Sequence, residues 1–260
     1  MKQRKSFRLI SAGLLLALWF TPGFAIEIRN LSQAVDVAGK QRMYTQRMLK
    51  DYAMSGMGNT FGDPQKDLQE TMKNFEDHLN ALIAFNKDPA TDASLQKVMK
   101  LWVPIKEKLA APPSKENAGQ MQEELEALLK QANEAVGLFA KQTGKVSGEI
   151  INISGRQRML SQRMASLYML KVWGVDDPKF KTKMDDAMKL FDTSLNKLMQ
   201  AEMTTPEIMG HLKKAKNAFM FFQIMNRSSS KFIPSLIYKK SNEILKSMNT
   251  ATGLYAAQEK

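Results

Sequence analysis

Apolar residues recur at steps of three and four along nearly the whole chain after residue 25, which is the pattern of amphipathic α-helices. Almost no segment shows the strict alternation of a half-buried strand. Helix-start signals such as Asp63-Pro64 and Thr205-Pro206 divide the pattern into segments. We therefore predict an all-α fold of two tandem antiparallel four-helix bundles. The eight predicted helices span residues 30–57, 64–85, 93–109, 116–142, 148–173, 178–201, 206–228 and 234–255.

The positions of the prolines leave two questions open, one about the third helix and one about the connection between the two bundles. Pro104 predicts a kink in the third helix or an earlier end to it. Between Ser114 and Asp177 there is no proline, so the fourth helix can continue into the fifth as one long helix. Such a helix would bend near Gly144 and Gly148.

An internal repeat with a period of 116 residues organises the chain. Residues 39–48 and 155–164 are identical at seven of ten positions, and residues 72–82 match 188–198 at the same offset. A weaker echo pairs residues 132–134 with 241–243, which requires a different offset. The repeat predicts two domains, residues 26–144 and 145–260.

The first 25 residues have the character of a secretory signal peptide. Four cations in the first eight residues precede an apolar run at residues 9–20, and a small residue, Ala25, stands at the expected cleavage position. Cleavage after Ala25 predicts a periplasmic protein, with an uncleaved membrane anchor as the alternative. No later segment is apolar enough to span a membrane, and export argues against nucleic acid as a partner.

Composition excludes several classes of function. The chain has 38 Lys and Arg against 26 Asp and Glu, a net charge of +12, and no cysteine. Disulfides, thiolate metal sites and a cysteine nucleophile are therefore excluded. No catalytic constellation surrounds His78 or His211, so we predict a non-enzyme without metal or cofactor. A copper site built from the 19 methionines is the less favoured alternative to core packing.

The repeated ten-residue block is polar for a helix that packs. At 3.6 residues per turn its glycine, arginine and glutamine fall on one stripe between apolar residues, which indicates a buried interface with a polar middle. Two such stripes facing each other would bring Arg42 and Arg158 together, and the block holds no acid, so a bound anion is favoured over a purely structural role. The alternative is that its arginines pair with Asp or Glu on neighbouring helices. Within its own helix, Arg47 can pair with Asp51. The candidate ligand-binding residues are Arg42, Arg158, Gly39, Gly155, Gln46, Gln162, Lys40 and Arg156.

Both blocks resemble the signature of the NarX-type and PilJ-type sensor input domains, found in nitrate/nitrite sensor kinases and in the type IV pili methyl-accepting chemotaxis transducer. The resemblance implies a periplasmic four-helix bundle whose first helix carries the motif. In the nitrate sensors one motif arginine from each of two subunits holds nitrate, and this arginine corresponds to Arg42 and Arg158. A lysine that also contacts nitrate there is replaced here by Val37 and Ile153, and Lys40 and Arg156 could supply a second cation.

The duplication suggests that one chain imitates the dimer of such a sensor, with Arg42 and Arg158 across a pseudo-twofold axis. We therefore expect a module that binds a small oxyanion, such as nitrate or nitrite, and signals through a separate membrane receptor or sensor kinase. The alternative is a ligand-free scaffold that docks on a chemoreceptor or a pilus-linked component.

Overall fold

The computed structural model describes residues 26–144, 146–175, 177–227 and 233–258, so the expected signal peptide lies outside the described residues. The described part of the chain forms eight helices and no strand, which confirms the all-α prediction. None of these helices is both long enough and apolar enough to cross a membrane. The helices are α1 (Leu31–Gly56), α2 (Pro64–Phe85), α3 (Pro89–Ala110), α4 (Lys115–Thr143), α5 (Val146–Trp173), α6 (Lys179–Met199), α7 (Pro206–Arg227) and α8 (Pro234–Ala257).

Polar caps set where the helices of the first repeat begin. Side chains of Asn30, Asp63 and Ser114 accept hydrogen bonds from backbone N–H groups of the first turns of α1, α2 and α4. Asp88 caps α3 in the same way, so this helix begins at Pro89, one turn earlier than predicted. Helix α3 also continues past Pro104 to Ala110, so of the two outcomes expected at this proline, a kink or an earlier end, the earlier end does not occur.

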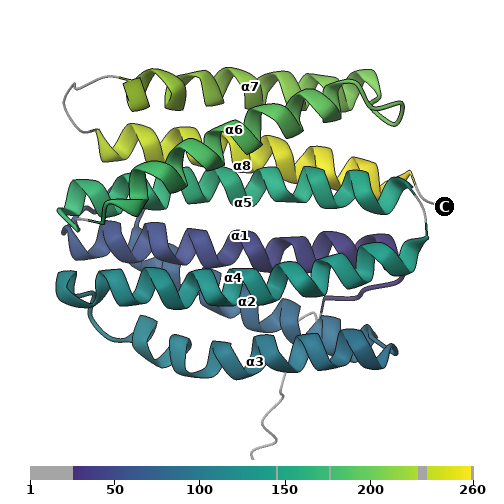
Figure 1. Ribbon diagram of the computed structural model, residues 1–260, viewed down its shortest axis with the longest axis horizontal. Coiled ribbons are helices and arrows are strands. Elements are labelled where there is room, and N and C mark those ends of the chain that lie inside the picture. The colour runs from purple at the N-terminus through teal and green to yellow at the C-terminus, as the bar shows by residue number, and fades with distance from the viewer. Residues whose placement is uncertain (1–25, 145, 176, 228–232, 259–260) are drawn as a thin grey trace, which may run out of the picture.

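The connection between the repeats is a tight reversal. Helix α4 ends at Thr143, and Gly144 adopts a left-handed conformation with φ of 63° while its N–H bonds to the carbonyl of Lys141 at 3.2 Å. A residue with a Cβ rarely adopts this φ, which is why glycine ends the helix here. Helix α5 returns antiparallel to α4 (Figure 1), so the long continuous helix that the sequence left open does not form.

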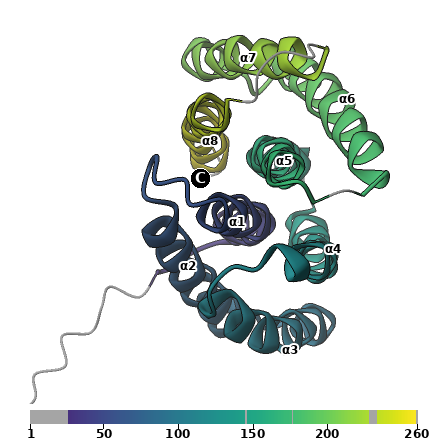
Figure 2. The same cartoon turned by 90° about the vertical axis from the view of Figure 1, so that its left-hand side faces the viewer.

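The eight helices make two four-helix units that share a central face. Helices α1 to α4 form one unit and α5 to α8 the other, and successive helices within each unit run in opposite directions (Figure 1). Viewed end on, α1 and α5 lie at the middle of the molecule, whereas α3 and α7 lie at its two extremes (Figure 2). Helices α1 and α5 run parallel and make the most extensive contact of any helix pair.

Equivalent residues build the two hydrophobic cores. Phe75 packs on Trp102 with ring centroids 4.5 Å apart, and Phe191 packs on Phe219 at the same 4.5 Å in the second unit. Methionines such as Met48 and Met164 are fully buried among these apolar side chains. They therefore fill the core, as the helical stripes predicted.

Candidate functional site

The two motif helices approach most closely where Gly39 faces Gly155. A methyl group added to Gly39 would lie 2.9 Å from Nη2 of Arg158 and 4.0 Å from the Cα of Gly155. A methyl group on Gly155 would meet the same guanidinium at 2.9 Å and Nη2 of Arg42 at 3.5 Å. The space left by the missing side chains is therefore occupied by the two arginine head groups, which the sequence predicted to meet.

Arg42 is completely buried and is held by neutral groups. Its Nη1 donates to the side-chain oxygens of Asn133 and Asn152, both at 2.8 Å, and its Nη2 donates to the backbone carbonyl of Asn152 at 3.1 Å. Its Nε has no acceptor. Among the described residues no carboxylate forms an ion pair with Arg42, so its charge has no direct counterion there.

Arg158 is equally buried but has a counterion. Its Nη1 donates to Oδ1 of Asp36 at 2.7 Å and to Oδ1 of Asn249 at 3.3 Å, and its Nη2 donates to the backbone carbonyl of Asp36 at 3.0 Å. Lys40 contacts the same carboxylate at 3.1 Å. The alternative role considered for the motif arginines, an ion pair with a neighbouring helix, therefore holds for Arg158 but not for Arg42.

The two arginine environments are related by the repeat offset. Adding 116 to Asp36 gives Asn152, and adding 116 to Asn133 gives Asn249, so each arginine has equivalent partners from the other helices. The sequence echo that paired Asn133 with Asn242 is wrong, because the structure keeps the offset of 116 in α4 and α8. The one chemical difference among these partners is an aspartate in place of an asparagine.

Burial and neighbouring charges make the two halves electrostatically unlike. Burial, and then the charges of Arg156 and Arg158, lower the pKa of Arg42 well below its usual value. For Asp36, burial raises the pKa, but Arg158 and Lys40 outweigh it and bring the pKa below its usual value. The centre therefore contains two guanidinium groups and one carboxylate in direct contact with one of them.

The two motif glutamines lie in a second polar layer, one turn further along the helices. Gln46 donates to Glu126 at 3.2 Å and accepts from Ser166 at 3.2 Å. Gln162 accepts from Lys50 at 3.0 Å and donates to the backbone carbonyl of Ser241 at 3.2 Å. The hydrogen bonds of both glutamines thus go to this second layer. The central contact is formed by four of the predicted ligand residues, Gly39, Arg42, Gly155 and Arg158.

A buried charge cluster next to this layer was not found from the sequence. Lys50 and Asp51 are both fully buried, 3.4 Å apart, and Lys50 lies 4.2 Å from the ring centroid of Tyr238. Burial raises the pKa of Asp51 well above its usual value, and Arg47 contacts this carboxylate at 3.9 Å, which confirms the predicted pair. Arg47 also pairs with Asp67. Comparison of the two repeats could have indicated this cluster, because the second repeat has Ser166 and Leu167 at the positions of Lys50 and Asp51.

Arg163 also has a carboxylate partner, Glu126, at 2.9 Å. The two remaining predicted ligand-binding residues, Lys40 and Arg156, lie on α1 and α5 and are partly exposed. Among the described residues, no group of three or more histidine and carboxylate side chains is placed to hold a metal ion.

Comparison with known proteins gives one match. The family model described as type IV pili methyl-accepting chemotaxis transducer N-terminal, PilJ, matches residues 27–138 and again residues 138–209. Each match contains one motif helix, so the two matches follow the internal repeat. No curated protein and no solved structure matches the chain.

Proposed function

The chain belongs to the PilJ family of type IV pili methyl-accepting chemotaxis transducer N-terminal domains, and on this premise we propose that it binds one small oxyanion between α1 and α5. The family is sensory and non-catalytic, and its domains are typically periplasmic sensors. Nitrate or nitrite is the ligand that the motif favours. The signal then passes to a separate membrane partner, such as a chemoreceptor or a sensor kinase.

The observation that carries this proposal is the uncompensated charge of Arg42. A guanidinium group with 0% exposure and no counterion is strongly unfavourable in a low-dielectric interior. An anion bound beside it would supply the missing negative charge and an acceptor for the unused Nε. The proposed ligand is therefore the counterion that no side chain around Arg42 provides.

The net charge of the centre favours a monovalent anion. Among the fully buried groups of the centre, Arg42 and Arg158 contribute two positive charges, and the mostly buried Asp36 contributes one negative charge; Lys40 also contacts Asp36 but is partly exposed, so solvent screens its charge. One monovalent oxyanion would balance the remaining charge, whereas a divalent ion would leave an excess negative charge to bury. Nitrate and nitrite satisfy this condition and sulfate does not.

Two exposed asparagines offer a route to the buried arginines. Asn133 and Asn249 are exposed at the surface, yet each accepts a hydrogen bond from one buried guanidinium. Their amide oxygens are neutral acceptors, so an anion can take their place with stronger, charge-assisted hydrogen bonds. We therefore propose that the anion displaces one of these two side chains from its arginine.

Thermal unfolding of the chain from residue 26 onward tests the proposal. We expect nitrate or nitrite at 100 times its dissociation constant to stabilise the protein by about 2.7 kcal/mol. Sulfate and chloride at equal ionic strength should do less. Arg42→Met should abolish the specific response, whereas the matched variant Arg163→Met, which removes a motif arginine with its own carboxylate partner, should keep it.

The alternative function is a helical interaction protein without a ligand. The ion pairs of Arg47, Arg158 and Arg163 favour it, because each of these arginines has a carboxylate partner within the protein. Equal stabilisation by all four salts, unchanged in Arg42→Met, would contradict the oxyanion proposal and support this alternative.

A further inference from the structure

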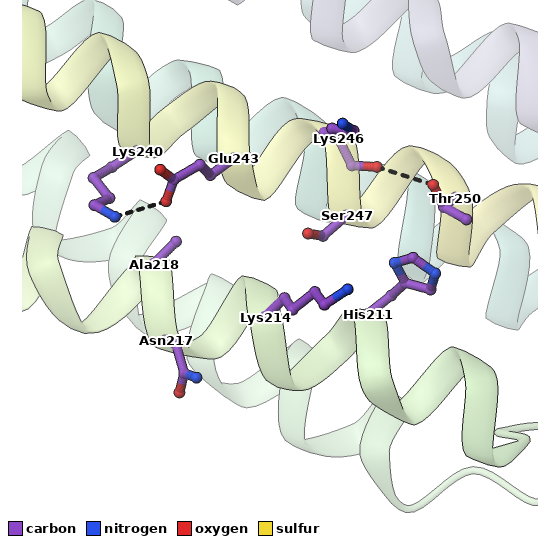
Figure 3. A pocket seen from close by; sticks show the side chains of 9 residues that line it. All are labelled: His211, Lys214, Asn217, Ala218, Lys240, Glu243, Lys246, Ser247 and Thr250. Atoms are coloured by element: carbon purple, nitrogen blue, oxygen red, sulfur yellow. Dashed lines mark hydrogen bonds and ion pairs between the residues drawn. The ribbon is translucent and has the colours of Figure 1, made fainter.

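A groove between α7 and α8 forms a concave site, remote from the central arginines. Its cavity has a volume of about 460 Å³, within the range of small-molecule sites. The residues that give it its chemistry are His211, Lys214, Lys240, Glu243, Lys246 and Ser247 (Figure 3).

Positive charge dominates the groove. Three lysines line it against one carboxylate, Glu243, which accepts a hydrogen bond from Lys240 at 2.7 Å. Lys214 and Lys246 form no ion pair among the described residues. In Figure 3 the Lys214 side chain runs along the groove toward His211 and lies below the hydroxyl of Ser247. The groove thus presents an excess of cations beside neutral hydrogen-bonding groups.

The first repeat provides an internal comparison, because α3 and α4 form the equivalent pair there. Phe219 in α7 corresponds to Trp102 in α3, because each packs on the equivalent phenylalanine of its repeat. By this alignment Ser94 corresponds to His211. Gln131 in α4 corresponds to Ser247 in α8. Gln131 donates to Ser94 and to Glu134, each at 3.0 Å, so these polar groups satisfy one another.

Charge also differs between the two helix pairs. The equivalent of Lys240 in α4 is Glu124, and the equivalent of Thr250 is Glu134. Lys246 corresponds to Lys130 at the offset of 116, and Lys214 corresponds to Lys97 at the offset of 117 by which Phe219 corresponds to Trp102, so these two cations occur in both repeats. The excess of positive charge in the groove is therefore specific to the second repeat.

We propose that the α7–α8 groove binds an organic phosphate, that is, a phosphate group carried on a small polar body. Lysine ammonium groups are compact point charges that suit phosphate without requiring planar, bidentate geometry. His211 and Ser247 line the same groove and provide polar contacts beside the charge. The cavity is larger than a bare oxyanion fills, so the carrier of the phosphate occupies the remainder.

This site does not depend on the proposed oxyanion site. Helix α7 lies at one extreme of the molecule and α1 and α5 at its middle (Figures 1 and 2). A soluble phosphate ester or the head group of an anionic phospholipid could supply the ligand, since both carry the same phosphate chemistry.

Titration calorimetry with glycerol 3-phosphate and with inorganic phosphate tests the proposal, alongside flotation with phosphatidylglycerol and phosphatidylcholine vesicles. The test variant is Lys214→Gln with Lys246→Gln. The matched control is Lys97→Gln with Lys130→Gln, which removes the same charge at the equivalent positions of the first repeat. All four lysines are exposed, so both variants should fold.

We expect the test variant to lose affinity for glycerol 3-phosphate at least tenfold and the control to change less than twofold. Binding only to phosphatidylglycerol vesicles, with the same difference between variants, supports the lipid head group as the source. Equal losses in both variants, equal affinity for inorganic phosphate, or no saturable binding of any probe would overturn the proposal.

Discussion

Arg42 and Arg158 have almost the same surroundings in the two halves of the molecule, yet only one of them is neutralised. Asp36 lies against Arg158, and its repeat equivalent, Asn152, lies against Arg42. The two side chains have nearly the same shape, and each accepts a hydrogen bond from Nη1 of its arginine, at 2.7 Å for Asp36 and 2.8 Å for Asn152. Arg158 therefore has both hydrogen-bond acceptors and a counterion, whereas Arg42 has hydrogen-bond acceptors alone.

The difference shows that duplication can keep a hydrogen-bond network while changing its charge. Two aspartates would make each half self-sufficient, and two asparagines would leave two buried positive charges. The observed combination leaves one. This single uncompensated charge in a preformed network is the feature on which the proposed anion site rests.

Removing each arginine in turn should reveal the largest difference in unfolding free energy between the two halves. Arg158→Met leaves the carboxylate of Asp36 mostly buried, with Lys40 as its remaining partner, and should destabilise the protein by about 3 kcal/mol. Arg42→Met removes a buried charge that has no counterion and should leave stability unchanged or raise it by about 1 kcal/mol or more. Urea unfolding of both variants without added anion measures the difference.

Equal destabilisation by the two substitutions would contradict the electrostatic difference between the halves. It would show that packing of the arginine side chains, rather than the counterion, determines their contribution.

The close approach of the two helices should be sensitive to a single methyl group. Gly39→Ala places a carbon 2.9 Å from Nη2 of Arg158 and should cost about 1–3 kcal/mol through displacement of that guanidinium. Gly137→Ala in α4 meets no atom within 4 Å and should instead stabilise the protein by about 0.5–1 kcal/mol. Thermal unfolding of both variants checks the contrast, and a neutral Gly39→Ala would mean that the Arg158 guanidinium can move aside at no cost in stability.

The ionisation of Asp36 should produce a smaller, pH-dependent effect. Its pKa is lower in the folded protein than the usual value of about 3.9, so its stabilising contribution is present above that pH. The contribution is lost as the pH falls through the folded pKa, at about 1.4 kcal/mol for each unit of the shift. The difference in unfolding free energy between the natural chain and Asp36→Asn should therefore shrink between pH 5 and pH 2, and a constant difference would contradict the ion pair.

Much of the fold followed from the sequence because its signals are local. Helix periodicity, capping residues and the repeat of 116 residues predicted all eight helices and the meeting of Arg42 with Arg158. The reversal at Gly144 was left open because a glycine inside a proline-free segment is compatible with either a bend or an αL cap.

The charge balance of the site could not be predicted, because it depends on contacts between helices far apart in the chain. Asp36 lies 122 residues before Arg158, and Asn133 lies 91 residues after Arg42. Neither residue belongs to the repeated ten-residue block, so the sequence of that block does not reveal the counterion. Knowledge of the 116-residue offset in α4 and α8 would have identified Asn133 and Asn249 as a pair.

Nitrate titration calorimetry of three proteins tests the central claim most directly: Asp36→Asn, the natural chain and Asn152→Asp. If the uncompensated charge of Arg42 creates the site, nitrate affinity should be highest in Asp36→Asn and lowest in Asn152→Asp, while stability without nitrate follows the opposite order. Equal nitrate binding by all three proteins, or none by any of them, would contradict the claim that this charge is held for an anion.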